Sequence, residues 1–167
     1  MTVAALERIE SPFVIADDAP NVYLYPGRIF TSVEPMVVST ILGSCVAVCL
    51  WDPSAAVGGI NHFLLPSNPS RGASDPRYGD TAMTRLIDSM VERGAATRRL
   101  VAKIVGGASV LDAFAGARKS IGDQNVAIAR EFLSRLDIRI TGDQTGGRKG
   151  RKLLFHTGNG TAYVKEI

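Results

Sequence analysis

Short apolar stretches rich in β-branched residues alternate with turn residues along most of the chain. Eight runs of this kind predict strands, at 22–25, 36–38, 45–50, 60–65, 100–105, 138–141, 153–155 and 162–164. The last two flank a Gly-Asn-Gly turn at 158–160, so we expect them to form a hairpin.

Two longer segments carry apolar residues at the three-and-four spacing of a helix with one buried face. They predict helices at 81–93 and 123–136, and the apolar residues of the second helix are less regularly spaced. Because strands outnumber helices and the first strands come in adjacent pairs, the pattern favours a layered α+β fold. A doubly wound parallel sheet would instead alternate strands with helices throughout.

The length of 167 residues is that of a single domain. Residues 1–21 carry scattered charges, two prolines and no sustained periodicity, so we interpret them as a loosely attached N-terminal arm. The expected domain therefore spans 22–167.

Composition and charge exclude several classes of protein. With 46% hydrophobic and 21% charged residues, the composition indicates neither a disordered nor a membrane-spanning protein, and no apolar run is long enough to cross a bilayer. Charges at 7–10 interrupt the first apolar stretch, so we do not expect a signal peptide there. The net charge of +3 is a mild excess, and the basic stretch 148–152 has no interleaved aromatic residues, so nucleic-acid binding is not expected.

Cys45 follows a flexible Gly-Ser step at the start of an expected strand. Gly43 permits a sharp bend, so that consecutive backbone N–H groups can converge on an oxyanion. Strand alternation places Cys45, Ala47 and Cys49 on one face. This position suits a nucleophile, although the usual role of a free cysteine is that of a small buried hydrophobic residue. Two cysteines this close together are no disulfide scaffold, and we expect reduced thiols in the cytoplasm.

A catalytic thiol needs a base, and His62 lies on the strand that follows the cysteine strand. A hairpin turn centred between Pro53 and Ser54 places His62 directly opposite Cys45. A longer loop would slip the register, and an odd slip would put the two side chains on opposite faces. The alternative interpretation is that His62 is a structural histidine, buried in the core with its hydrogen bonds made. Cys45, Cys49 and His62 lack a fourth ligand, so a metal site is not expected.

A base usually needs a third group to orient it. Four residues near the expected dyad offer a suitable side chain, and the sequence does not choose between them: Ser39, Thr40, Asn61 and Asp52.

Several motifs in a fixed order carry a family resemblance. They are LGSCVAV at 42–48, WDP at 51–53, GGINHFLLP at 58–66, GGAS at 106–109, IGDQN at 121–125 and DQTGGRKGRK at 143–152. Over about 22–167 the chain resembles the CheD family of chemoreceptor glutamine deamidases. We expect the paired glycines at 106–107 and 146–147 to serve mainly tight turns with positive φ.

The resemblance implies a site, a reaction and partners. The nucleophile of the family falls on Cys45 and its histidine on His62. Its third catalytic residue, typically a threonine six positions before the cysteine, falls on Ser39, with Thr40 adjacent. The resemblance also implies layered β-sheets with helices outside, similar to the catalytic domain of cytotoxic necrotizing factor toxins.

The implied reaction is deamidation of receptor glutamines without metal or cofactor. The implied partners are the cytoplasmic domains of methyl-accepting chemotaxis proteins and, for some members of the family, a CheC-type phosphatase. The competing hypothesis is a non-catalytic adaptor that binds the same partners.

Overall fold

The computed structural model describes residues 7–8, 18–70, 74–110 and 119–167. Its helices are α1 (Gly79–Glu92) and α2 (Ile121–Arg135), with a short 3-10 turn, η1 (Thr97–Arg99). The strands are β1 (Glu7–Arg8), β2 (Asn21–Tyr23), β3 (Ile29–Ser32), β4 (Val37–Leu42), β5 (Val46–Asp52), β6 (Val57–Asn61), β7 (Val101–Gly106), β8 (Arg139–Thr145), β9 (Arg151–His156) and β10 (Ala162–Glu166).

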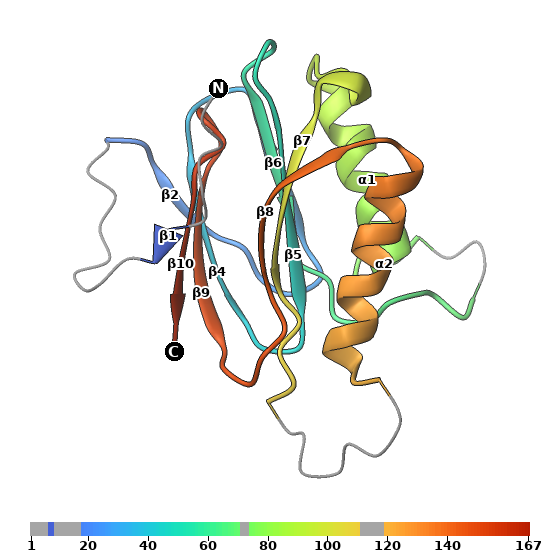
Figure 1. The fold of residues 1–167 in the computed structure, drawn as a ribbon. Helices are drawn as coiled ribbons and strands as arrows, with labels where there is room; N and C mark the ends of the chain where they lie inside the picture. The colour runs from blue at the N-terminus through green and yellow to red at the C-terminus, as the bar shows by residue number, and fades with distance from the viewer. Residues whose placement is uncertain (1–6, 9–17, 71–73, 111–118) are drawn as a thin grey trace.

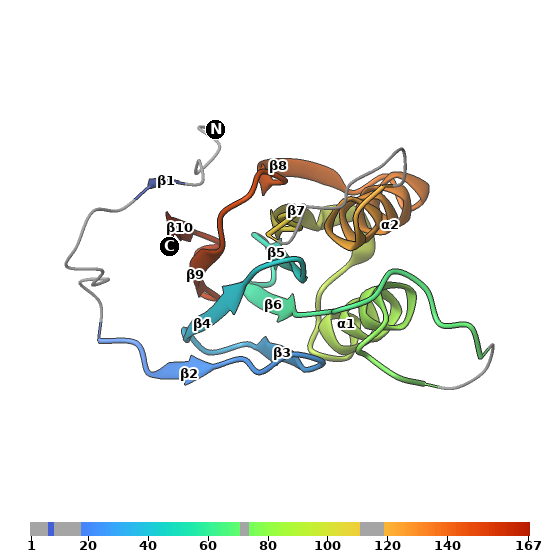
Figure 2. The same ribbon diagram turned by 90° about the horizontal axis from the view of Figure 1, so that it is seen from below.

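Two five-stranded sheets and a pair of helices form three layers (Figures 1 and 2). Sheet A has the strand order β1-β10-β9-β4-β2, and sheet B has the order β3-β6-β5-β7-β8. Both sheets mix parallel and antiparallel pairs. Seen from below, sheet B lies between sheet A and the helices (Figure 2). The predicted α+β fold, with layered sheets and helices outside, is confirmed.

The middle layer buries apolar residues on both of its faces. Towards the helices, Val48 and Leu50 of β5 pack with Met83 and Leu86 of α1. Towards sheet A, alternate residues of the same strands pack in a second core, which includes Ala47. This explains why β5 is a continuous apolar run, since a strand with both faces covered has no polar side.

Most predicted elements are present with shifted ends, but β1 and β3 were missed. The sequence of β3, IFTS, is short and mixes apolar with polar residues. The predicted terminal hairpin is confirmed, with Ala162 opposite Phe155. The helix α2 buries Val126, Ala129 and Leu133, whereas Leu136, the last residue of the predicted helix, follows α2 and is 39% exposed.

The four paired glycines adopt the backbone conformation that the sequence indicated. Gly106 and Gly107 have φ of 111° and 68°, and Gly146 and Gly147 have φ of 79° and 71°. Residues with a Cβ rarely adopt these angles.

The segment that we interpret as an N-terminal arm contributes β1, which pairs in parallel with β10 at one edge of sheet A. Residues 1–6 and 9–17 lie outside the described residues, and β2 begins at Asn21. The division of the chain at 21–22 stays a prediction. Neither α-helix in the described part of the chain combines the length and the apolar character that a bilayer crossing requires.

Candidate active site

The candidate site lies between the two sheets, where β4 faces β5 and β6. Alternation along β4 turns Val38 and Leu42 into the core between the sheets, and Thr40, which is 0% exposed, points the same way. The Thr40 hydroxyl lies 2.8 Å from Nδ1 of His62. Thr40 and His62 are thus brought together from different sheets.

Ser39 lies on the other face of β4, next to Leu154 of β9 and Tyr23 of β2 in the register of sheet A. The structure therefore corrects the expected contact: Thr40, not Ser39, meets the imidazole. The physical reason is the two-residue period of a strand, which points adjacent side chains in opposite directions.

The hydrogen bonds of Thr40 determine the tautomer of His62. A hydroxyl has a single proton, and Thr40 Oγ1 donates it to the carbonyl oxygen of Leu24 at 2.7 Å. The same oxygen must then accept the hydrogen bond from Nδ1–H of His62. In the neutral imidazole this leaves Nε2 without a proton, so Nε2 is the nitrogen that can act as a base.

Nε2 of His62 is buried and has no hydrogen-bond partner among the described residues. A buried acceptor without a partner is costly and is a frequent feature of reactive groups. Burial also lowers the pKa of His62 to about 4. The imidazole is consequently neutral near pH 7 and able to take up a proton.

Cys45 lies just before β5 and is half-buried, with its side chain against the core between the sheets. Burial raises the pKa of the Cys45 thiol, and its own backbone N–H opposes this rise. Cys49 is fully buried on the same face, and burial raises its pKa to about 12. Of the two thiols, Cys45 is therefore the accessible one.

The β5–β6 hairpin places Cys45 and His62 on one face, but not directly opposite each other. Cys49 pairs with Ile60, and Val46 forms an isolated bridge with Phe63, so in this register Cys45 lies opposite Leu64. The four-residue loop 53–56 causes this two-residue shift. The predicted direct opposition is wrong. The shift is even, so the shared face is kept, and His62 becomes the diagonal neighbour of Cys45.

Three consecutive backbone N–H groups, at Cys45 and the two residues before it, have no hydrogen-bond acceptor in another described residue. In the part of the chain that the structure describes, the backbone N–H groups of Gly43, Ser44 and Cys45 donate to no other residue. Donors of this kind can bind negative charge that develops on a carbonyl oxygen.

The other two candidates for the third residue serve different purposes. Asn61 accepts a hydrogen bond from the N–H of Val48 at 2.9 Å and faces Met83 with its amide nitrogen. Asp52 binds Arg99 at the far end of β5. Neither side chain forms a hydrogen bond with the imidazole of His62 in the described structure. The described residues also contain no group of three or more His, Cys, Asp or Glu side chains that could hold a metal ion.

Sequence reasoning missed one residue that borders the site. Asn125 of α2 donates from Nδ2 to the carbonyl oxygens of Ser44 and Leu64, at 3.0 and 2.9 Å. The signal was present, because Asn125 lies one turn before Ala129 on the buried side of the helix, where an asparagine has poor helix propensity and needs polar partners.

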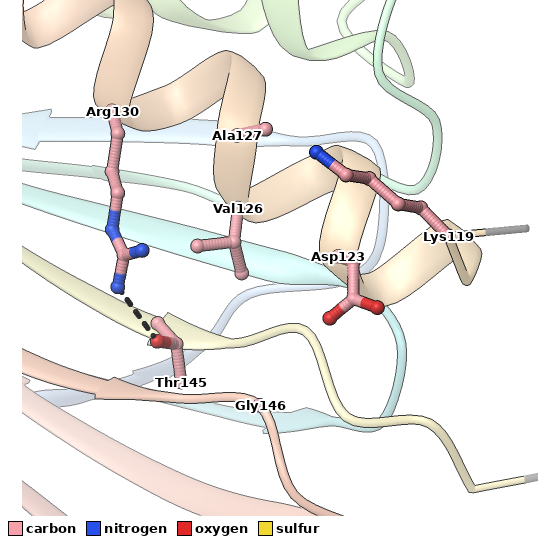
Figure 3. Close-up of a pocket in the computed structure, with 7 residues that line it drawn as sticks. All are labelled: Lys119, Asp123, Val126, Ala127, Arg130, Thr145 and Gly146. Atoms are coloured by element: carbon pink, nitrogen blue, oxygen red, sulfur yellow. Dashed lines mark hydrogen bonds between the residues drawn. The ribbon is translucent and has the colours of Figure 1, made fainter. Parts of the chain in front are cut away.

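A cavity of about 400 Å³ lies away from the thiol, between α2 and the end of β8 (Figure 3). Arg130 reaches across it to the hydroxyl of Thr145 at 3.2 Å. Val126, which lines it, belongs to the core on the helix side of sheet B, whereas Cys45 packs on the opposite side. This cavity is therefore separate from the candidate active site.

Comparisons with known proteins agree with the sequence resemblance. A family model described as CheD chemotactic sensory transduction matches residues 64–166. A protein of Anaeromyxobacter dehalogenans, named probable chemoreceptor glutamine deamidase CheD 1, is 48% identical over 147 residues, which cover 88% of this chain and 85% of that protein.

Two more proteins share the name probable chemoreceptor glutamine deamidase CheD. The protein of Rhizobium meliloti is 50% identical over 130 residues, covering 76% of this chain and 69% of its own. The protein of Sulfurimonas denitrificans is 38% identical over 145 residues, which cover 87% of this chain and 93% of that protein. An alignment over 88% of the chain leaves out at most about 20 residues, so the similarity to the Anaeromyxobacter protein extends over the β4–β6 region.

Proposed function

The chain belongs to the CheD family, and on this premise we propose that it is a chemoreceptor glutamine deamidase with Cys45 as its nucleophile. It hydrolyses glutamine side-chain amides of methyl-accepting chemotaxis proteins to glutamate and ammonia. The observation that carries the proposal is the hydrogen bond from His62 to Thr40, which leaves Nε2 open on the face that Cys45 shares.

The first half of the reaction forms a thioester. Nε2 of His62 takes the thiol proton as the Cys45 sulfur attacks the side-chain carbonyl carbon of glutamine. The oxyanion binds to N–H groups between Gly43 and Cys45, while Thr40 holds the Nδ1–H of the imidazolium. His62 then returns the proton through Nε2 to the nitrogen that leaves as ammonia.

The second half restores the enzyme. Nε2 of His62 removes a proton from water, and the resulting hydroxide attacks the thioester carbon. The carbon–sulfur bond breaks, the sulfur of Cys45 regains the proton from His62, and the product side chain is glutamate. Water is the only co-reactant, so the proposed reaction uses neither metal nor cofactor.

The proposed partners are the cytoplasmic domains of chemoreceptors, with a CheC-type phosphatase as a second partner, and we place the reaction in the cytoplasm. The two free cysteines support a reducing compartment. The competing hypothesis of a non-catalytic adaptor gives no reason for an imidazole whose free nitrogen is buried and unpaired on the face that Cys45 shares.

Intact mass spectrometry of a receptor cytoplasmic fragment tests the proposal. Incubation with the protein should raise the mass of the fragment, because each converted side chain exchanges an amide NH₂ for OH. Cys45→Ala should abolish this conversion, since no other accessible thiol can form the acyl intermediate. Cys49→Ala, the matched control, should leave most of the activity because Cys49 is buried. Full conversion by Cys45→Ala would end the thiol mechanism.

A further inference from the structure

Asn125 is a polar residue in the apolar face of α2, and it contacts both catalytic segments. It is 0% exposed, and its Nδ2 donates to the carbonyl oxygens of Ser44 and Leu64 at 3.0 and 2.9 Å. Ser44 directly precedes Cys45, and Leu64 lies two residues after His62. We propose that Asn125 is a positioning residue that holds Cys45 in register with His62, an inference that rests on the proposed function.

The two hydrogen bonds of Asn125, to Ser44 and Leu64, form a clamp between the catalytic segments. The need for this clamp follows from the weak pairing within the hairpin. The continuous β5–β6 ladder covers only four residue pairs, from Asp52–Val57 to Cys49–Ile60. Beyond it, the N–H of Val48 is bound by the side chain of Asn61, and the backbone of His62 bonds to Arg28 instead of β5. Among the described residues, the isolated Val46–Phe63 bridge is the only backbone pairing between the two strands close to the thiol.

Asn125 supplies a second connection at this weakly paired end. A carboxamide nitrogen has two N–H donors, one for each carbonyl, and both carbonyls lie on the chain segments that carry the reacting groups. Reacting groups that are displaced by about 1 Å can lose on the order of a hundredfold in rate. A bridge between the two segments is therefore a direct means of controlling catalysis.

The first turn of α2 is itself anchored to the nucleophile segment. Gly122 packs so closely on Gly107 that a Cβ would overlap the carbonyl group of Gly107. The N–H of Gly107 in turn donates to the carbonyl oxygen of Cys45 at 2.8 Å. Ser120 caps the helix by accepting from the N–H of Asp123 at 3.1 Å. Asn125 thus projects from a fixed base.

Three variants separate positioning from general stability. Asn125→Ala removes both donors. Asn125→Asp keeps the shape but, when ionised, offers only acceptors to the two carbonyls, and when protonated regains one donor. Leu133→Ala is the matched control. Leu133 is fully buried on the same helix, but its apolar side chain cannot form the hydrogen bonds that Asn125 donates to Ser44 and Leu64.

The readouts are kcat, KM and the melting temperature of the full chain, measured on a receptor fragment at several pH values. We expect Asn125→Ala to lower kcat by about ten- to a hundredfold with KM within about twofold. Leu133→Ala should lower the melting temperature at least as much as Asn125→Ala does, but it should leave kcat unchanged. The kcat of Asn125→Asp, relative to wild type, should rise as the pH falls and the carboxyl becomes protonated, whereas the ratio for Asn125→Ala should stay flat.

Two results would overturn the inference: wild-type kcat in Asn125→Ala, or an equal loss of kcat in Leu133→Ala. If the wild-type protein leaves the receptor fragment unchanged, the proposed function fails, and alkylation of Cys45 by iodoacetamide still tests the clamp. The rate of alkylation at pH 7 should then fall in Asn125→Ala, as in His62→Ala, because the base that takes up the thiol proton is no longer held in place. An unchanged rate in Asn125→Ala would refute positioning.

Discussion

At the scale of single residues, the site depends on which of two adjacent hydroxyls faces the imidazole. Thr40 points into the core between the sheets and accepts from His62, while Ser39 points to the outer face of sheet A. The methyl group of Thr40 restricts its χ1 angle, which keeps the hydroxyl directed at His62.

Thr40→Val should therefore lower kcat by roughly the hundredfold that is typical of impaired general acid–base catalysis. Valine has the same shape as threonine but cannot accept a hydrogen bond from Nδ1–H, so His62 loses the partner that fixes its tautomer. Thr40→Ser should keep most of the activity. Steady-state kinetics on a receptor fragment provide the measurement. Ser39→Ala is the control, and a damaging Ser39→Ala beside a silent Thr40→Val would reverse the assignment.

The pH dependence follows from the burial of the same two groups. Burial lowers the pKa of His62 to about 4 and raises the pKa of Cys45. The reactive form, a neutral imidazole beside a neutral thiol, is lost when His62 gains a proton as the pH falls. We expect kcat/KM to stay level from about pH 8 to pH 5 and to decline only in more acidic solution. A midpoint near 6.5, the ordinary value for histidine, would contradict this environment.

At the scale of elements, the strand ends near the thiol depend on glycine. Gly106 ends β7 with φ of 111°, and a Cβ there would overlap the carbonyl oxygen of Cys45. Because that oxygen belongs to the backbone, relief would require movement of the nucleophile segment itself.

Gly106→Ala should accordingly lower both the melting temperature and the activity. Gly146→Ala is the matched control: its φ is 79°, but no atom lies within 4 Å of the added Cβ. It should cost only the conformational strain of about 1–3 kcal/mol and leave kcat intact. Thermal unfolding and kinetics on both variants test this, and equal effects on kcat would argue against a role for the close contact.

At the scale of the whole molecule, one buried carboxylate ties the β5–β6 turn to the segment before β7. Asp52 is 0% exposed and accepts from Arg99 and from the N–H groups of Ser54, Ala55 and Ala96. Burial alone would raise the pKa of Asp52, but these hydrogen bonds outweigh it and lower the pKa to about 2.

Because the pKa of Asp52 in the folded protein is below its ordinary value of 3.8, the carboxylate stabilises the fold above that pH. This stabilisation is lost as the pH falls from 3.8 towards 2. Asp52→Asn should reduce the free energy of unfolding by about 1–3 kcal/mol at pH 7 and by less in acid. Urea unfolding at both pH values is the measurement. Asp143→Asn, in an exposed ion pair, should have little effect, and a deficit of Asp52→Asn that is equal at both pH values would exclude the linkage.

The amino-acid sequence by itself determined the features that depend on local periodicity. Apolar runs and helical spacing predicted most strands and both helices, and the two-residue period predicted that Cys45 and His62 share a face. This last result holds even though the loop 53–56 shifted the register, because an even shift preserves the face. The sequence motifs and their order also indicated the family to which the chain belongs.

Only the tertiary structure decided which side of β4 faces inwards. Val37, Ser39 and Ile41 on one side and Val38, Thr40 and Leu42 on the other are equally apolar, so the pattern along β4 does not distinguish them. The stacking of sheet A on sheet B makes the choice and turns Thr40 towards His62. The contact of Asn125 with Ser44 has the same origin, since it spans 81 residues and depends on how α2 packs against sheet B. Local periodicity describes the faces of each element, whereas packing between elements determines which faces meet.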